Sequence, residues 1–234
     1  MNTVDFSLVK PAPDDKVLDV GCGSGRHTCA AAMHENVCSV GLDLCFDDVR
    51  QADQRLEQNR AWIKGRCGTL VADITNLPFP DNHFDLVICS EVLEHVPAHE
   101  HALKELVRVL KPGKNLVVSV PSWFPERICW ALSKDYHQCA GGHVRIYRKD
   151  QLLAMIAAAG ASKWRVGRAH GLHAPYWWLK CLVGPDNDSS RLVKLYHRLL
   201  VWDMMKKPAL TRFLERALNP IIGKSTVIYS VKNK

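Results

Sequence analysis

One short segment constrains this chain more than any other. An apolar run at residues 17–20 meets the glycine turn GCGSG at residues 21–25, and an alanine-rich stretch follows at about 26–33. An apolar run bounded by glycines predicts a buried strand, and the alanine-rich stretch predicts a helix. Such a turn lets the backbone approach a bound nucleotide closely. The segment therefore predicts a strand, turn and helix of a nucleotide-binding fold.

The alternation of apolar and helical segments continues along the chain. We expect strands near 37–42, 69–72, 85–89, 115–120, 164–167 and 226–231, and helices near 46–63, 99–110 and 149–159. Strands that alternate with helices form a parallel sheet with helices on both faces, because parallel strands need crossover connections. We therefore predict the α/β class with a doubly wound, Rossmann-like sheet.

Two segments depart from this alternation. Residues 122–142 have an irregular pattern, and more than fifty residues separate the last two expected strands, against the roughly 2–6 of a usual connection. We therefore assign 1–168 together with 223–234 to one domain and 169–222 to an insertion. The second half of the chain, from residue 121, has 19 basic and 7 acidic residues, whereas the first half has 12 and 17, so the basic character belongs to the second half.

The spacing of the glycines limits the kind of nucleotide that the turn can bind. The turn reads GxGxG, with Arg26 and His27 where a dinucleotide fingerprint would need its third glycine, which disfavours a dehydrogenase. Asp19 stands two positions before the first glycine, where a carboxylate can bind an amino group. Acidic residues also end the expected second and third strands.

Through VLDVGCGSG at 17–25 the sequence resembles the class I S-adenosylmethionine-dependent methyltransferases, in particular the type 11 domain, over nearly all of residues 17–160. The resemblance implies a seven-stranded sheet whose last strand is antiparallel, with S-adenosyl-L-methionine as the cofactor. It implies that Asp43 binds the ribose hydroxyls and that Asp73 binds the adenine amino group. The full set of expected cofactor residues is Asp19, Gly21, Gly23, Gly25, Asp43, Leu44, Asp73, Ile74 and Ser90.

The segment SEVLEH at 90–95 is similar to that of the O-methyltransferases of ubiquinone biosynthesis, which implies a divalent metal on Glu91, Glu94 and His95. Residues at i, i+3 and i+4 share one helical face, so these three side chains could reach one ion. In the alternative, which we favour, the acids cap the following helix and no metal binds. His95 and His143 are the candidate bases for a hydroxyl acceptor, because imidazole titrates near neutrality. A hydrogen-bonded loop histidine is the alternative for His143.

The insertion at 169–222 should start at the edge of the sheet where cofactor and acceptor meet, so we expect a helical lid over the active site. It contains Tyr176-Trp177-Trp178-Leu179 followed by Lys180, then a helix after Ser189-Ser190 and a short helix near 210–218. The first of these helices should carry an apolar face of Leu192, Leu195, Tyr196, Leu199, Leu200 and Trp202 opposite Arg191, Lys194 and Arg198. We expect this face to pack on the domain; peripheral contact with an anionic membrane is the alternative.

These observations lead to one functional prediction. We expect a methyltransferase that acts on a small or lipid-like acceptor, at oxygen, in the cytoplasm or at the inner surface of the membrane. An RNA methyltransferase that uses the basic half and a non-catalytic binding module are the alternatives. Methylation of nucleic-acid bases is disfavoured, because 90–93 reads SEVL where amine-directed enzymes have an Asn/Asp-Pro-Pro-aromatic segment, and Pro121 precedes a serine instead of a cysteine. The oligomeric state stays open.

Overall fold

The computed structural model describes residues 2–138, 142–185, 187, 189–206 and 208–234. Its centre is a seven-stranded sheet in the order β3-β2-β1-β4-β5-β7-β6. The strands are β1 (Lys16–Val20), β2 (Cys38–Asp43), β3 (Arg66–Val71), β4 (Phe84–Ser90), β5 (Leu110–Pro121), β6 (Ala161–Ala169) and β7 (Ser225–Lys232). β7 lies between β5 and β6 and is antiparallel to both, whereas β1 to β5 are parallel. The predicted fold class is confirmed.

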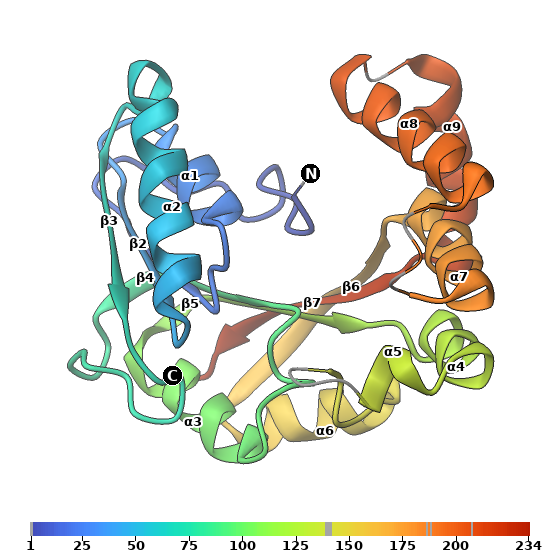
Figure 1. The fold of residues 1–234 in the computed structure, drawn as a ribbon. Coiled ribbons are helices and arrows are strands. Elements are labelled where there is room, and N and C mark those ends of the chain that lie inside the picture. The colour runs from blue at the N-terminus through green and yellow to red at the C-terminus, as the bar shows by residue number, and fades with distance from the viewer. Residues whose placement is uncertain (1, 139–141, 186, 188, 207) are drawn as a thin grey trace.

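Helices cover both faces of the sheet (Figure 1). They are α1 (Arg26–Ala32), α2 (Phe46–Gln58), α3 (His99–Val109), α4 (Trp123–Leu132), α5 (Asp135–Gln138), α6 (Lys149–Ala158), α7 (Ala174–Val183), α8 (Arg191–Lys206) and α9 (Ala209–Ile222), with short 3-10 turns η1 (Arg60–Trp62) and η2 (Gly171–His173). α1 and α2 lie on one face and α3 and α6 on the other.

The two-residue period of the strands builds two cores. In β4, Leu86 and Ile88 pack with Ala31 of α1 and the N-terminal segment, whereas Val87 and Cys89 pack with α3 and α6 on the opposite face. Both faces are thus apolar, as in a sheet that helices cover on two sides. This double cover leaves the edge at the carboxyl ends of β1 to β5 as the place for polar side chains.

The prediction of an irregular segment at 122–142 is wrong for most of its length. α4 and α5 form there, while 139–141 lie outside the described residues. Pro125 falls in the first turn of α4, where a backbone N–H has no partner within the helix, so it is tolerated. α7 was missed for the same reason, because Pro175 sits in its first turn. In both places the proline lies in the first turn of a helix and does not interrupt it.

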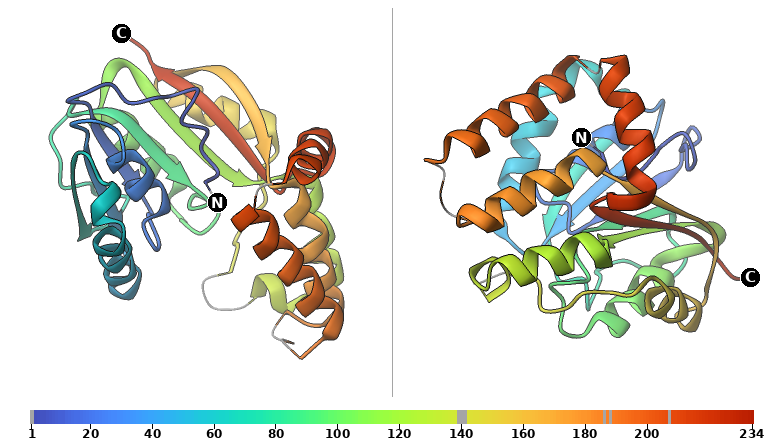
Figure 2. Two further views of the ribbon diagram at one scale, coloured as in Figure 1. Left: turned by 90° about the horizontal axis from the view of Figure 1, so that it is seen from above. Right: turned by 90° about the vertical axis from the view of Figure 1, so that its right-hand side faces the viewer.

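The insertion between β6 and β7 is helical, as predicted, and it joins α4 in one layer beside the sheet. Figure 2 shows α4, α7 and α8 side by side, with α9 across their ends. The indole Nε1 of Trp178 on α7 donates to the carbonyl of Pro125 on α4 at 3.1 Å. The Lys224 ammonium lies 4.5 Å from the ring centre of Trp177. The helical layer is therefore attached to the sheet at the start of β7 and through α4.

The expected packing of the α8 apolar face is largely wrong. Leu200 is buried, but Leu192 and Leu195 are 63% and 65% exposed, and Trp202 is 47% exposed. The helix instead turns Asp203 inward, where the carboxylate pairs with Arg212 of α9. In the described part of the chain, no helix has the length and apolar character needed to cross a membrane.

Candidate active site

A cavity of about 960 Å³ opens at the carboxyl ends of β1 to β4. Pockets for small ligands in proteins typically measure roughly 300–1,000 Å³. The residues that line it are Gly21, Gly23, Leu42, Asp43, Leu44, Cys45, Asp48, Ala72, Asp73, Ile74, Thr75, Glu91, Val92, His95, Val96, Pro97 and Ala98. This is the edge of the sheet at which open α/β folds bind their ligands.

The glycine turn forms one wall of the cavity, and its glycines have different tasks. Gly21 has φ 67°, and a Cβ there would lie 2.2 Å from Val92 Cγ2. Gly25 has φ 73°, and its Cβ would lie 2.8 Å from Ala52 Cβ. Gly23 meets nothing within 4 Å. Gly21 and Gly25 therefore permit close packing behind the turn, while Gly23 leaves open space where a ligand can approach the backbone.

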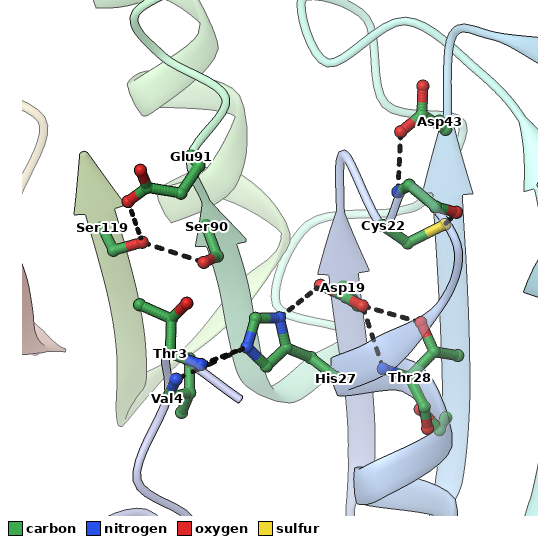
Figure 3. Close-up of polar contacts among 12 residues, drawn as sticks. Thr3, Val4, Asp19, Cys22, His27, Thr28, Asp43, Ser90, Glu91 and Ser119 are labelled. Carbon is green, nitrogen blue, oxygen red and sulfur yellow. Dashed lines mark hydrogen bonds and ion pairs between the residues drawn. The ribbon is translucent and has the colours of Figure 1, made fainter. Parts of the chain in front are cut away.

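Asp43, at the end of β2, holds the turn in place. Its Oδ2 accepts a hydrogen bond from the Gly23 amide at 2.9 Å, and its Oδ1 accepts one from the Cys45 amide at 3.0 Å. Figure 3 shows this carboxylate beside the turn. A carboxylate that accepts two backbone N–H groups is held in one orientation by them. The predicted ribose-binding residue thus lies on the cavity wall, with its geometry fixed by the same loop.

Three predicted cofactor residues lie behind the cavity wall and are not among its lining residues. Asp19 is 1% exposed, and its Oδ2 accepts from the amide and the hydroxyl of Thr28 at 2.9 and 2.7 Å (Figure 3). Ser90 exchanges a hydrogen bond with Ser119 at 2.8 Å. Gly25 packs on α2. The structure therefore gives these residues supporting positions, with Asp19 joining β1 to the first turn of α1.

The other predicted cofactor residues line the cavity. Asp73 is exposed, and its Oδ1 accepts from the Thr75 amide at 2.8 Å. Ile74 is buried next to it, and Leu44 is 70% exposed. Carboxylates at the ends of β2 and β3, an open glycine and exposed apolar side chains match the polar and apolar parts of a nucleoside. The residues present therefore fit S-adenosylmethionine.

Two acids follow β4 in a strained turn. Glu91 has φ 59°, a conformation that non-glycine residues rarely adopt, and its Oε1 accepts from the Ser119 hydroxyl at 3.0 Å. Glu94 is 1% exposed, and neither carboxylate oxygen has a hydrogen-bond partner among the described residues. Burial raises the pKa of both carboxyl groups, and the neighbouring Glu91 raises the pKa of Glu94 further.

Both candidate bases lie near these acids. The rings of His95 and His143 have centroids 4.9 Å apart, and Nδ1 of His95 lies 3.2 Å from the Gly142 carbonyl. One ligand atom from each of Glu94, His95 and His143 lies within 4.8 Å of the others. The three groups that could share a metal therefore include His143, whereas the predicted set had Glu91 in that place.

Sequence reasoning missed Glu126, the partner of His143. Nδ1 of His143 lies 2.5 Å from Glu126 Oε1, and this carboxylate is 2% exposed. It also accepts from Trp130 Nε1 at 3.0 Å and from the Tyr136 hydroxyl at 3.4 Å. Glu126 lies on α4, in the segment expected to be irregular. An acid in an aromatic-rich segment was the available signal, because a buried carboxylate needs several donors.

Comparison with known proteins agrees with this geometry. Residues 18–118 match a family model described as a methyltransferase domain. The chain contains a class I, S-adenosylmethionine-dependent methyltransferase domain. S-adenosylmethionine is the cofactor of this family, as predicted. The matched residues run from β1 to β5 and so include the whole lining of the cavity.

Relatives of the methyltransferase domain act on different atoms, as their names show. The 24-methylenesterol C-methyltransferase 2 of Arabidopsis thaliana is 36% identical over 110 residues, which are 47% of this chain and 30% of that protein. The 27-O-demethylrifamycin SV methyltransferase of Amycolatopsis mediterranei is 34% identical over 104 residues, which are 44% and 38%. The chain thus spans less than half the length of these curated relatives.

The fold of the methyltransferase domain extends over the whole chain. A solved S-adenosylmethionine-dependent methyltransferase of Methanosarcina mazei superposes with a TM-score of 0.65 over 100% of this chain and 99% of that one, at 15% sequence identity. Such a likeness concerns the fold alone.

Proposed function

We propose that this protein transfers a methyl group from S-adenosylmethionine to a hydroxyl oxygen of a small or lipid-like acceptor. The observation that carries the proposal is the pair of His143 and buried Glu126, placed next to His95 at the rim of the cofactor cavity. A carbon nucleophile activated by its own double bond has less need of such a base, whereas a hydroxyl must lose its proton.

In this proposal, different cavity residues bind different parts of the cofactor. With S-adenosylmethionine bound, Asp43 would accept from the ribose hydroxyls, Asp73 would accept from the adenine amino group, and the Ile74 amide would donate to the ring. Gly21 and Gly23 would bring the turn close to the methionine part, and Leu44 would contact the adenine. Asp19, Gly25 and Ser90 act from behind, because they fix the backbone that makes these contacts. The bound cofactor supplies an electrophilic methyl group on its sulfonium.

His143 removes the proton of the acceptor in this proposal. If Nδ1 carries the proton that it shares with Glu126 Oε1, then Nε2 has the lone pair that accepts a proton from the hydroxyl. Glu126 fixes the tautomer and stabilises the imidazolium that forms. His95, which lines the cavity, positions the acceptor beside this base.

A divalent metal on Glu94, His95 and either Glu91 or His143 stays a prediction. It has a direct test in the turnover of the protein after chelation. Loss of turnover that Mg²⁺ or Zn²⁺ restores would support the metal, whereas full turnover in chelator would leave the His143–Glu126 pair as the sole base.

The insertion has an exposed apolar surface that bears on the class of acceptor. The α8–α9 apolar face consists of Leu192, Leu195, Leu199, Trp202, Met205, Leu210, Phe213, Leu214 and Ile221, all at least 39% exposed. Exposed basic side chains accompany it at Arg191, Lys194, Arg198, Lys206 and Arg216. Apolar stripes beside basic side chains fit the surface of an anionic membrane. We therefore place the protein at the cytoplasmic surface of a membrane that holds its acceptor.

Vesicle binding tests this placement. Cosedimentation with vesicles that contain anionic phosphatidylglycerol should be strong at low salt and fall as salt rises. The double variant Leu195→Ser/Trp202→Ser should bind more weakly, whereas the variant Phe46→Ser, which changes an equally exposed apolar side chain outside the face, should bind as the unchanged protein does. Equal binding by all three proteins would overturn the membrane contact.

The identity of the acceptor is tested with methyl-labelled cofactor and fractionated cell extract. Label in an alkali-stable ether of a lipid fraction supports the proposal. Label in RNA would favour the alternative that uses the basic half, and label on carbon would contradict the assignment to oxygen. Cofactor binding without transfer to any fraction would favour a non-catalytic binding module.

A further inference from the structure

A second cluster of metal-binding side chains lies in the insertion, apart from the cofactor cavity. One ligand atom from each of His170, His173 and Glu215 lies within 4.8 Å of the others. The two histidines come from the end of β6 and from η2, and Glu215 comes from α9. None of them lines the cofactor cavity, whereas His170 and Glu215 line a separate cavity of about 750 Å³ beside the N-terminal segment.

The polar atoms of this cluster are buried without partners. His170 is 9% exposed and Glu215 is 6% exposed. Nδ1 of His170, Nδ1 of His173 and Oε1 of Glu215 have no hydrogen-bond partner among the described residues. A buried polar atom without a partner is costly, and three such atoms on the side chains of one small cluster are unusual in a folded protein. A cation that accepts lone pairs from all three atoms would remove this energetic cost.

Two other atoms of the cluster are held by neighbouring side chains. His170 Nε2 lies 3.0 Å from the Thr3 hydroxyl, and Glu215 Oε2 accepts from Arg212 Nη1 at 2.8 Å. If Nε2 of His170 donates to Thr3, its Nδ1 carries the lone pair. Metal-bound histidines usually donate their second ring nitrogen in this way, and metal-bound carboxylates are themselves hydrogen-bonded.

We propose that His170, His173 and Glu215 bind one divalent transition-metal ion and that this ion is Zn²⁺. Two imidazole nitrogens and one carboxylate oxygen are a donor set that suits Zn²⁺, with water at a fourth position.

The site would fasten the insertion to the domain. His170 follows the last residue of β6, while Glu215 lies in the middle of α9, the helix that returns the chain to β7. Thr3 connects the same point to the N-terminal segment, which also donates from its backbone to His27 on α1 at 3.1 Å. One ion would therefore connect β6, α9 and, through Thr3, the helix after the glycine turn. Its role is structural, and the methyl-transfer residues do not depend on it.

The test uses the full chain, stripped of metal with chelator and dialysed, with Zn²⁺ and Co²⁺ as the probes. We expect one equivalent of Zn²⁺ to bind, to raise the melting temperature, and to be matched by a visible absorption band of bound Co²⁺. His173→Ala and Glu215→Gln should each abolish saturable binding at this site. Thr3→Val should weaken binding by roughly 10–100-fold, the usual cost of losing an outer hydrogen bond to a ligand.

Two control variants separate this site from others. His197→Ala removes an exposed histidine of the same insertion, and His95→Ala removes one from the cofactor-side cluster. Both should keep the Zn²⁺-dependent rise in melting temperature. Binding of S-adenosylhomocysteine to His173→Ala and Glu215→Gln checks that each variant is folded. The proposal is overturned if the unchanged protein shows no saturable Zn²⁺ binding, or if folded Glu215→Gln and His173→Ala bind it as tightly as the unchanged protein.

Discussion

Polar side chains find their hydrogen-bond partners differently in the cofactor half and in the helical layer of this molecule. Around the glycine turn, acidic side chains accept from backbone amides of the turn and of its neighbouring segments: Asp19 binds Thr28, and Asp43 binds Gly23 and Cys45. In the helical layer the partners are side chains that belong to no motif, as when His143 meets Glu126 or His170 meets Thr3. Partners within a motif can be recognised in the sequence, whereas partners outside any motif cannot. The first region can therefore be predicted and the second cannot.

The largest expected effect comes from closing the glycine turn. Gly21→Ala would place a Cβ 2.2 Å from Val92 Cγ2 at φ 67°, so the glycine turn or the segment around Val92 must shift. We expect a loss of at least ~2 kcal/mol of unfolding free energy and of detectable S-adenosylhomocysteine binding. Urea unfolding and calorimetric titration measure the two quantities.

The matched control for that variant is Gly113→Ala. Gly113 has φ 73°, but a Cβ there meets nothing within 4 Å. It should therefore lose only about 1 kcal/mol and keep cofactor binding. If the two variants lose equal stability and both keep the cofactor, the account of the turn as a close-packed wall is wrong.

The next effect tests whether the helical layer reaches the chemistry. Glu126→Gln keeps the shape of the side chain but removes the charge that orients His143, so kcat should fall about 10–100-fold while cofactor affinity stays unchanged. Single-turnover rates measure kcat, and calorimetric titration with S-adenosylhomocysteine measures the affinity. Glu100→Gln, at an exposed position of α3, serves as the control, and an unchanged rate in Glu126→Gln would remove the base assignment.

A smaller effect is expected where α7 meets α4. Trp178→Phe removes the hydrogen bond to the Pro125 carbonyl and should lower the unfolding free energy by roughly 1 kcal/mol. Because α4 carries Glu126, kcat should fall slightly as well. Trp62→Phe, at a 70% exposed position in the cofactor half, should change neither. Equal results from both tryptophan variants would mean that the helical layer does not hold α4 in place.

The smallest effect concerns an ion-pair group at the other end of the sheet. Burial alone would raise the pKa of Asp85, but hydrogen bonds from Lys111, Lys114 and the Lys16 amide lower it below its ordinary value of 3.8. The folded state therefore favours the carboxylate, so its stabilisation is complete above about pH 4 and disappears as pH falls further. Asp85→Asn should lose about 1 kcal/mol at pH 7 and nothing at pH 2.

Urea unfolding at those two pH values provides the check for Asp85. Asp81→Asn is the control, because Asp81 is 70% exposed and its pair with Arg108 is worth little. A loss in Asp85→Asn that is the same at both pH values would mean that the effect is not electrostatic.

The sequence predicted the cofactor half well because each inference rested on local chemistry. The glycine turn and the acids that end β2 and β3 are visible in the sequence. The alternation of strands and helices also led to the correct sheet, with β7 antiparallel as the family resemblance implied. Asp19 was expected to bind the cofactor, and its burial and its bond to Thr28 required the structure.

The helical layer resisted prediction for physical reasons. Pro125 and Pro175 each stand in the first turn of a helix, and neither apolar segment shows a clear helical period. The orientation of α8 depends on the pair of Asp203 with Arg212, which no periodic pattern reveals. Whether the insertion covers the cavity stays a prediction, since the residues that line the cavity come from 21–98.

The most direct test of the account is the melting temperature of the protein with and without S-adenosylhomocysteine, compared with Asp43→Ala. We predict that a saturating ligand raises the melting temperature of the unchanged protein by several degrees and that Asp43→Ala loses most of that gain. Asp53→Ala, an exposed acid on α2, should keep it. An unchanged melting curve for the unmodified protein would contradict the central claim that this cavity binds S-adenosylmethionine.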